Sequence, residues 1–285
     1  MRLTAMKQKL LTAVLVLIGM PLWAHAEGHG PVFGLATPTL GKGQWSSDTG
    51  FMRMESDAGG AWRAREMLGY GITEDLQVTL TAPVGNRDVL QSMVNARAGA
   101  MMGASDAVEA SLLWRFHRVA PAVGMRRESS LLLGVADGAK LGRTGMEIGP
   151  TLHAAIVTGF ASRTTYWWLG AGAQRDVGQD RVQQGALTYA TAVFGWRPPV
   201  FRGDYPKPDW RLFIETVAEH SERDRMNGVT LENSGGTRWL AGPSVLGLFG
   251  KWGVSGGVLF PIDEQLNGEQ PDTKYRAKVV FTYWF

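Results

Sequence analysis

Hydrophobic and polar residues alternate with a period of two through many short segments of this chain. Such alternation is typical of a β-strand whose two faces meet different surroundings. Within residues 105–117, Leu112 and Trp114 share one face, whereas Glu109 and Arg115 share the other. The same pattern predicts twelve strands, at 45–54, 61–70, 76–84, 105–117, 126–136, 149–159, 164–175, 185–196, 209–219, 237–247, 252–260 and 274–285. Some of these segments are ambiguous, so about ten or fourteen strands are alternatives.

The last predicted strand has one wholly apolar face. That face carries alternate residues near the end of the chain: Val279, Phe281, Tyr283 and Phe285. The opposite face is polar at Arg276 and Lys278, with Val280 and Trp284 as apolar exceptions. A strand with lipid on one side and a polar interior on the other has this pattern. The segment resembles the C-terminal sorting strand of bacterial outer-membrane proteins, and the resemblance implies recognition by the barrel-assembly machinery. The last strand of a soluble sandwich is the alternative.

The connections between the predicted strands alternate in length. Long ones fall at 85–104, 137–147, 176–184, 220–236 and 262–273, and most of those in between are short. The short first connection at 57–60 and the longer one at 197–208 are exceptions. Outer-membrane barrels combine short periplasmic turns with longer extracellular loops. We therefore predict an all-β fold over residues 44–285: a transmembrane antiparallel up-and-down β-barrel of about twelve strands with that arrangement of connections.

Two single positions test this prediction. Trp167 and Trp168 are neighbours in a predicted strand, so one of them must face the interior. Glu66 falls on the apolar face of segment 61–70, where an ion facing lipid is costly. A bulge or a different strand boundary is therefore expected near Glu66.

The first 26 residues have the layout of a secretory signal peptide. Arg2, Lys7 and Lys9 precede an apolar run at 10–20, and the small residues of 24–26 offer a cleavage site after Ala26. An uncleaved anchor is the alternative. Without these three charges, 26 of the 29 basic residues remain against 26 acidic ones, so no nucleic-acid partner is expected.

Composition limits the remaining chemistry. No stretch after residue 26 has the 18 or so consecutive apolar residues of a transmembrane helix. The chain has no cysteine, which excludes disulfides and thiolate chemistry. Its 37 glycines and 11 tryptophans, with 45% hydrophobic residues, are typical of a barrel whose apolar residues are spread over many short strands.

Residues 27–43 are rich in glycine and proline and are predicted to lie in the periplasm or inside the barrel. Cleavage after Ala26 would create a free N-terminus at Glu27, with His29 in third position. An amine, two amides and an imidazole can bind Cu(II) or Ni(II) in square-planar geometry. A flexible glycine-rich terminus without metal is the alternative, and no other cofactor is predicted.

The polar faces of the predicted strands supply the candidate lumen-lining residues. They carry both signs of charge: Glu109, Arg115, His117, His153, Arg211, Glu215, Glu219, Arg276 and Lys278. Such charges could pair across a narrow interior, or they could flank a water-filled path and set its selectivity. A twelve-stranded barrel is intermediate between filled and open barrels, so both alternatives stay open.

Two motifs carry a family resemblance. The sequence YGITEDLQV at 70–78 and the opening HGPVFGLATPTLGKGQW at 29–45 resemble bacterial outer-membrane barrels grouped with a "MetA-pathway of phenol degradation" protein. The resemblance implies a Gram-negative outer-membrane location, contact with outer-membrane lipids, and passive transport of a small solute, either a hydrophobic or aromatic compound or a metal-related cargo.

Two other functions remain alternatives to transport. One is a non-conducting barrel with a structural or metal-binding role beside an efflux system. The other is a lipid-modifying enzyme, which would need a Ser/His/Asn constellation. No pattern in the sequence places such residues together, so no enzymatic activity and no catalytic residue are predicted.

Overall fold

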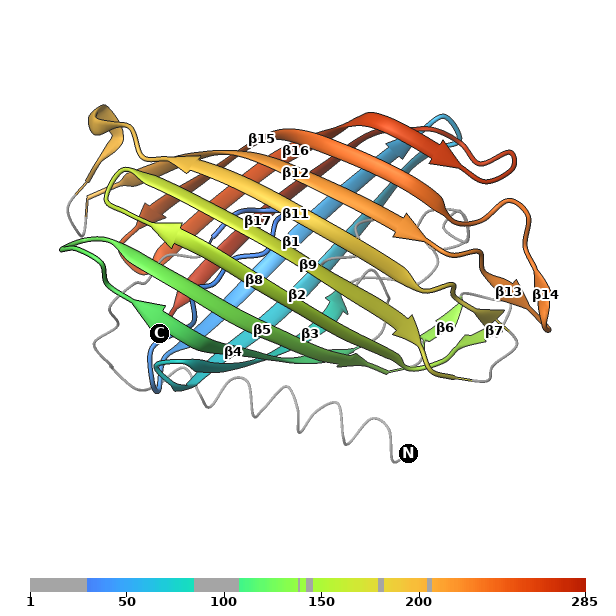
Figure 1. Cartoon of the computed structure of the whole chain (residues 1–285), viewed down its shortest axis with the longest axis horizontal. Coiled ribbons are helices and arrows are strands. Elements are labelled where there is room, and N and C mark those ends of the chain that lie inside the picture. The colour runs from blue at the N-terminus through green and yellow to red at the C-terminus, as the bar shows by residue number, and fades with distance from the viewer. Residues whose placement is uncertain (1–29, 85–107, 138, 142–145, 179–181, 204–206) are drawn as a thin grey trace.

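The computed structural model describes residues 30–84, 108–137, 139–141, 146–178, 182–203 and 207–285. Twelve long strands form one closed antiparallel barrel (Figure 1). In spatial order they are β1 (Trp45–Ser56), β2 (Gly59–Thr73), β3 (Leu76–Val84), β4 (Glu109–Val119), β5 (Arg126–Ala136), β8 (Thr151–Ala161), β9 (Thr165–Asp176), β11 (Leu187–Trp196), β12 (Asp209–Ser221), β15 (Gly236–Phe249), β16 (Trp252–Leu266) and β17 (Thr273–Trp284). The predicted fold class and strand number are confirmed. The predicted signal peptide and the loop at 85–104 lie outside the described residues.

The two faces of the strands differ as the alternation predicts. In β11, buried and exposed residues alternate without interruption from Leu187 to Trp196. Trp168 is 3% exposed and faces the interior, whereas Trp167 is 38% exposed and faces outward, so this prediction is confirmed. Large apolar side chains also cover the outside of many other strands. The barrel therefore has the apolar outer surface that a lipid environment requires.

The two ends of the barrel have different connections. The end that carries the start of β1 also has the connections at 74–75, 120–125, 162–164, 197–208 and 250–251, and we call it the short-turn end. The other end, the long-loop end, bears short strands that pair in a second sheet: β6 (Ala139–Leu141), β7 (Met146–Ile148), β10 (Val182–Gln183), β13 (Arg225–Met226) and β14 (Val229–Thr230). The sequence did not predict this second sheet.

The first and last strands close the barrel along their whole length. β1 and β17 are in register from Ser46, opposite Trp284, to Glu55, opposite Tyr275. Beyond them, the N–H of Trp45 donates to the carbonyl of Phe285 at 2.9 Å, and the reverse bond is 3.1 Å long. Closure of this kind leaves the sheet without an open edge.

Two positions differ from the sequence expectation. In β2, Glu66 lies opposite Thr49 in an unbroken register, so the bulge expected near Glu66 is not present there. Glu66 therefore lies on the outer face. The hydroxyls of Ser47 and Thr49 each donate to its carboxylate at 2.6 Å, which satisfies the ion locally. In β4 the register shifts between Arg115 and His117. His117 consequently pairs with Ser129 and lies on the outer face, not on the lumen face.

Among the described residues, no helix is long and apolar enough to cross a bilayer. The only helical element in that part of the chain is a 3-10 turn, Pro199–Phe201, at the short-turn end.

Candidate functional site

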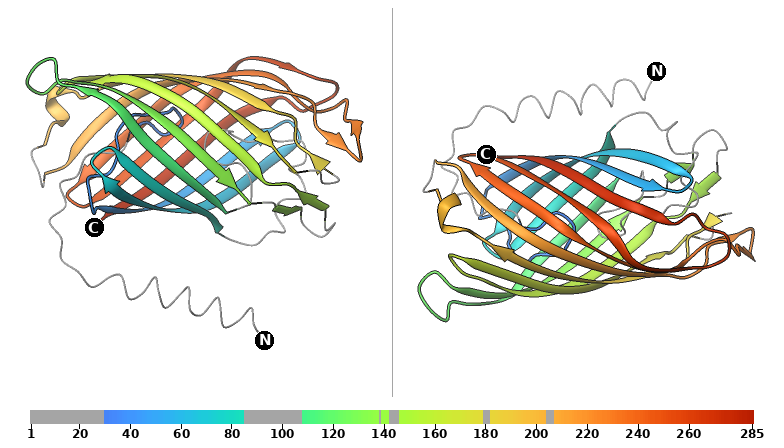
Figure 2. Two further views of the ribbon diagram at one scale, coloured as in Figure 1. Left: turned by 60° about the horizontal axis from the view of Figure 1, so that its bottom comes forward. Right: turned by 90° about the horizontal axis from the view of Figure 1, so that it is seen from above.

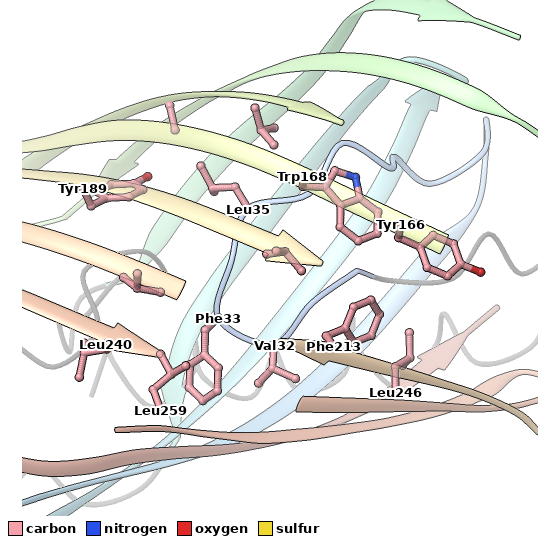
Figure 3. Close-up of a cluster of buried hydrophobic side chains, with 14 of the residues drawn as sticks. Val32, Phe33, Leu35, Tyr166, Trp168, Tyr189, Phe213, Leu240, Leu246 and Leu259 are labelled. Atoms are coloured by element: carbon pink, nitrogen blue, oxygen red, sulfur yellow. The ribbon is translucent and has the colours of Figure 1, made fainter. Parts of the chain in front are cut away.

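Residues 30–44 run inside the barrel, and we call them the lumen segment (Figure 2). The side chains of Val32, Phe33 and Leu35 are 4%, 8% and 7% exposed. They pack among apolar side chains on the inner faces of β8 to β16, which include Val157, Trp168, Tyr189, Val193, Phe213, Val217, Leu240, Leu246 and Leu259 (Figure 3). Burying each such side chain contributes about 1.5–3 kcal/mol. The apolar side of the interior therefore holds the segment by packing.

The buried carboxylate of Glu215 anchors the lumen segment. It is 0% exposed and accepts the backbone N–H groups of Val32 at 2.8 Å, Phe33 at 2.7 Å and Gly34 at 2.6 Å. The hydroxyl of Ser244 donates to the same carboxylate. Hydrogen bonds to an ionised acceptor are about twice as strong as neutral ones. The hydrogen bonds from three consecutive amides of the segment thus offset the free-energy cost of burying the Glu215 carboxylate on β12.

Two further features hold this part of the segment against the wall. The ammonium of Lys278 donates to the carbonyl of Val32 at 3.1 Å, from β17, three strands away from β12 around the barrel. A Cβ atom at Gly34 would lie 2.2 Å from Cγ2 of Val193, so only glycine allows this close approach. The segment is therefore held through its backbone N–H groups by Glu215 and through the carbonyl of Val32 by Lys278.

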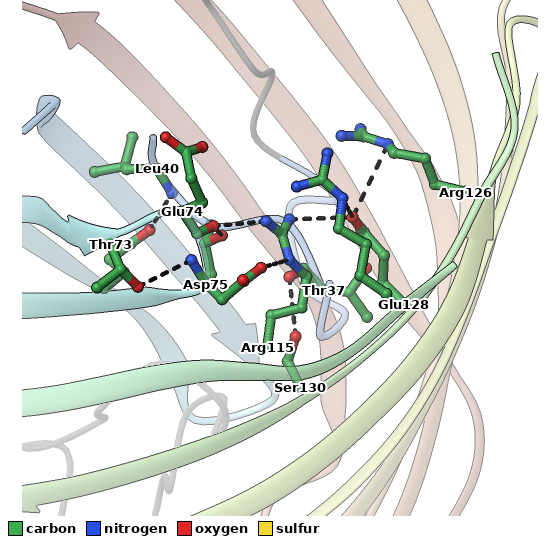
Figure 4. Close-up of polar contacts among 12 residues, drawn as sticks. Thr37, Leu40, Thr73, Glu74, Asp75, Arg115, Arg126, Glu128 and Ser130 are labelled. Atoms are coloured by element: carbon green, nitrogen blue, oxygen red, sulfur yellow. Dashed lines mark hydrogen bonds and ion pairs between the residues drawn. The ribbon is translucent and has the colours of Figure 1, made fainter. Parts of the chain in front are cut away.

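A second anchor lies at Thr37. Its hydroxyl donates to Glu128 at 3.1 Å and accepts the indole N–H of Trp168 at 3.1 Å, and the hydroxyl of Ser130 donates to its carbonyl at 3.0 Å. Glu128 is 2% exposed and forms an ion pair with Arg115 at 3.0 Å (Figure 4). The segment is in this way tied to a charged cluster near the short-turn end.

Arg115 is the centre of that cluster. Its side chain is 1% exposed and also donates to Asp75 at 2.8 Å and to the carbonyl of Glu74 at 2.6 Å. The hydroxyl of Thr39, in the lumen segment, donates to the same carbonyl of Glu74 at 2.8 Å. The turn, the lumen segment and β4 therefore form one connected polar network.

A cavity of about 250 Å³ remains between the lumen segment and the opposite wall. The segment borders it with apolar side chains that include Val32 and Leu35. The facing strands, mainly β1 to β4 and β17, supply its polar lining: Asp48, Arg65, Gln77, Thr79, Thr81, Glu109, Ser111, His153, Lys278 and Thr282. The interior is thus divided into an apolar half covered by the segment and a polar half that borders the cavity.

Eight of the nine predicted lumen residues lie on the inner face, His117 being the exception. Glu109, His153 and Lys278 border the cavity, and His153 is hydrogen-bonded to Tyr189. The other five lie elsewhere in the interior: Arg115, Arg211, Glu215, Glu219 and Arg276. The structure therefore does not unite all of the predicted residues in one site.

Two of these residues form a bidentate ion pair. Both terminal nitrogens of Arg276 donate to Glu219, at 2.7 and 2.8 Å, and both side chains are almost fully buried. Arg211 lies over the ring of Tyr166 at 5.3 Å and contacts Asp209 at 3.4 Å. Mixed charges in the interior thus include pairs that hold the strands together.

Sequence reasoning missed several residues that shape the site. Glu128 and Ser130 occupy alternate positions of β5, so the period of two could have indicated their inward direction. Thr37 and Phe33 lie in a segment without alternation, and no local signal showed which wall they contact. The predicted metal ligands Glu27 and His29 lie outside the described residues. In the described part of the chain, no group of three potential metal ligands is present.

Comparison with known proteins supports the fold. No protein family matches the sequence. No curated protein matches it either. Among solved structures, an outer-membrane channel from Pseudomonas putida F1 is similar with a TM-score of 0.57 and 11% identity, over 87% of this chain and 98% of that one. The NanC porin is similar with a TM-score of 0.51 and 6% identity, over 83% and 98%. At these identities the likeness concerns the fold, and the chain has the fold of porin-like outer-membrane β-barrels.

Proposed function

We propose that the protein is an outer-membrane channel, in which a small solute passes between the lumen segment and the polar wall of β1 to β4. The observation that carries this proposal is the cavity of about 250 Å³ along that wall. Its volume lies just below the range of about 300–1,000 Å³ typical of drug-sized ligands. It therefore suits a solute of few atoms.

The orientation of the barrel is part of the proposal. Outer-membrane barrels expose short turns to the periplasm and long loops to the exterior. The short-turn end would accordingly face the periplasm, after removal of residues 1–26, and the last strand, β17, would engage the assembly machinery. Membership in the family around the phenol-degradation protein, and a hydrophobic, aromatic or metal-related cargo, remain proposals that rest on the two sequence motifs.

One observation favours a non-conducting barrel as the second candidate. The lumen segment fills the apolar half of the interior and is bound at Glu215, Thr37 and the β2–β3 turn. Such extensive anchoring could close the passage. We propose no catalytic step. His153 and His220 are hydrogen-bonded to Tyr189 and Thr237, and Ser129, which lies opposite His117, shares a hydrogen bond with Thr158.

Planar-bilayer recording tests the channel. The full chain and a variant lacking residues 30–41 are purified, and their folding is verified by the heat-dependent gel shift of an intact barrel. We expect small single-channel events from the full chain and larger ones from the deletion variant. Absence of events from both folded proteins would contradict the channel. Events from the deletion variant alone would favour the non-conducting alternative.

A further inference from the structure

Three polar side chains border the cavity without a partner of their own. They are Thr81 on β3 and Glu109 and Ser111 on β4. Thr81 is only 6% exposed, and the other two are partly buried. In the described part of the chain, none of the three side chains has a hydrogen-bond partner, and Glu109 forms no ion pair. A polar group that is shielded from water and left unpaired costs free energy, so these groups favour a partner that enters the cavity.

The three side chains lie next to one another on the inner wall. Thr81 is directly opposite Glu109 in the β3–β4 ladder, and Ser111 follows Glu109 by two residues on the same face. Gly134 on β5 lies beside both residues of β4. A Cβ atom at Gly134 would be 3.3 Å from Oε1 of Glu109 and 3.5 Å from Cβ of Ser111. The carboxylate and the two hydroxyls therefore form one group, which we call the acceptor patch.

Neighbouring polar groups of the cavity already hold the lumen segment. The amide oxygen of Gln77 accepts the backbone N–H of Leu40 at 2.8 Å. The ammonium of Lys278 donates to the carbonyl of Val32 at 3.1 Å. The acceptor patch differs from both, because the lumen segment makes no hydrogen bond to it in the described part of the chain.

The charge of the acceptor patch comes from Glu109. This carboxylate interacts electrostatically with Arg65 on β2, without an ion pair between the two. Arg65 is opposite Pro83, two residues beyond Thr81 toward the long-loop end, so it lies to one side of the patch. The patch itself consists of one negative group and two hydroxyls. Such a set favours a cationic group that can donate several hydrogen bonds.

We propose that Thr81, Glu109 and Ser111 bind the primary ammonium group of a small organic solute. An ammonium has three N–H donors and no acceptor, which matches one carboxylate and two hydroxyls. A short alkyl body would lie against Val32 and Leu35 of the lumen segment, which border the same cavity. The inference rests on the proposed channel and names the class of solute that its cavity accepts.

Equilibrium binding tests the acceptor patch without relying on transport. The full chain in a deuterated non-ionic detergent is titrated with n-butylammonium chloride at low salt and near neutral pH, and saturation-transfer NMR of the ligand methyl group measures the affinity. Glu109→Gln keeps the shape of the side chain and removes its charge. Glu269→Gln, in the exposed connection between β16 and β17, removes the same charge outside the cavity. We expect Glu109→Gln to lose at least about tenfold in affinity and the control to stay within about twofold.

The hydroxyls give a second test, which holds even if Glu109→Gln fails to fold. Thr81→Val and Ser111→Ala should each weaken n-butylammonium binding by about twofold to tenfold, since each removes one acceptor. Unchanged affinity in both of these variants would overturn the patch, and so would equal affinity of Glu109→Gln and the wild type.

The choice of ligand separates an ammonium site from a merely charged or apolar cavity. Tetramethylammonium has the same charge without N–H donors, and n-butanol has a similar alkyl body without charge. Both should bind at least about tenfold more weakly than n-butylammonium. Equal binding of either compound would overturn the proposal, as would undetectable binding of n-butylammonium to the folded wild type.

Channel recording keeps this inference distinct from the proposed function. In planar bilayers, n-butylammonium should reduce the single-channel current of the wild type and not that of Glu109→Gln. Binding of n-butylammonium without any channel events would leave the acceptor patch standing and contradict the channel. Channel events without n-butylammonium binding would do the reverse.

Discussion

The carboxylate of Glu215 accepts the backbone N–H of Val32 at 2.8 Å, across 183 positions of sequence. Phe33 and Gly34 donate to the same carboxylate, at 2.7 and 2.6 Å. This contact joins the start of the described chain to the inner face of β12. It helps to hold the lumen segment inside the barrel.

Replacing Glu215 by glutamine should loosen the lumen segment. An amide has one acceptor oxygen and cannot accept three N–H groups as a carboxylate does. A hydrogen bond to a charged group contributes about 1.5–3 kcal/mol, so amide exchange at Val32, Phe33 and Gly34 should accelerate at least about tenfold. Hydrogen–deuterium exchange with mass spectrometry measures this effect. Glu219→Gln, on the same face of β12, is the control and should leave these amides protected.

Substitution of Lys278 by methionine should raise conductance. The change removes the donor to the carbonyl of Val32 and a cation from the cavity wall. The flexible, unbranched methionine fits a similar space. Single-channel recording at several salt concentrations measures the outcome. Unchanged conductance and unchanged ion selectivity would show that solute does not pass along this wall.

Breaking the pair of Arg276 and Glu219 should reduce stability more than it changes conduction. Both side chains are buried, and removal of one leaves the other without its counter-charge. Loss of one partner of a buried pair costs about 3–5 kcal/mol. We expect Arg276→Met to lower the urea midpoint of unfolding in lipid vesicles. The double variant Arg276→Met/Glu219→Leu should recover much of the loss, and failure to recover would show that the pair has another role.

Glu128 and Asp75 should differ in their effect on stability, although both contact Arg115. The side chain of Glu128 is 2% exposed, while that of Asp75 is 49% exposed. Glu128→Gln should therefore cost about 3–5 kcal/mol, as for a buried pair. Asp75→Asn should cost about 0–1 kcal/mol, as for an exposed one. Urea unfolding of the two variants, measured side by side, gives the difference. Equal losses would contradict the buried position of Glu128.

Deleting Phe285 should reduce the amount of folded barrel. The residue exchanges two backbone hydrogen bonds with Trp45, and its ring stacks on those of Trp45 and Tyr283. These contacts complete the closure between β1 and β17. The folded fraction in isolated membranes can be measured by the heat-dependent gel shift. Val135→Ala, on the outer face of β5 and outside the last strand, is the control and should assemble nearly as well as the wild type.

The strands were predictable because alternation is a local property. β17 shows this most clearly, since even Val280 and Trp284, which interrupt its polar face, point inward at 7% and 3% exposure. The pair Trp167 and Trp168 shows the same rule at neighbouring positions. His117 departs from it, because the bulge after Arg115 shifts the alternation by one position. A bulge depends on the partner strand, and the sequence of β4 does not reveal it.

The candidate site was predictable only in part. Inward-facing charges followed from the alternation, but their partners did not. Arg276 and Glu219 are 57 positions apart, and Arg115 meets Glu128 only because a hairpin folds β4 against β5. The role of residues 30–44 had no local signal, since their hydrogen bonds go to side chains on distant strands.

The sequence by itself determined the barrel and the two faces of most strands, because the contrast between the interior and lipid imposes a period of two on every strand. It favoured twelve strands and left ten or fourteen as alternatives, between which the closed barrel decided. The tertiary structure alone decided what fills the barrel. Closure through β1 and β17 brings the inner faces together, and the burial of Glu215 is compensated by the amides of Val32, Phe33 and Gly34. The physical reason is that a buried charge must find its partners wherever the fold places them.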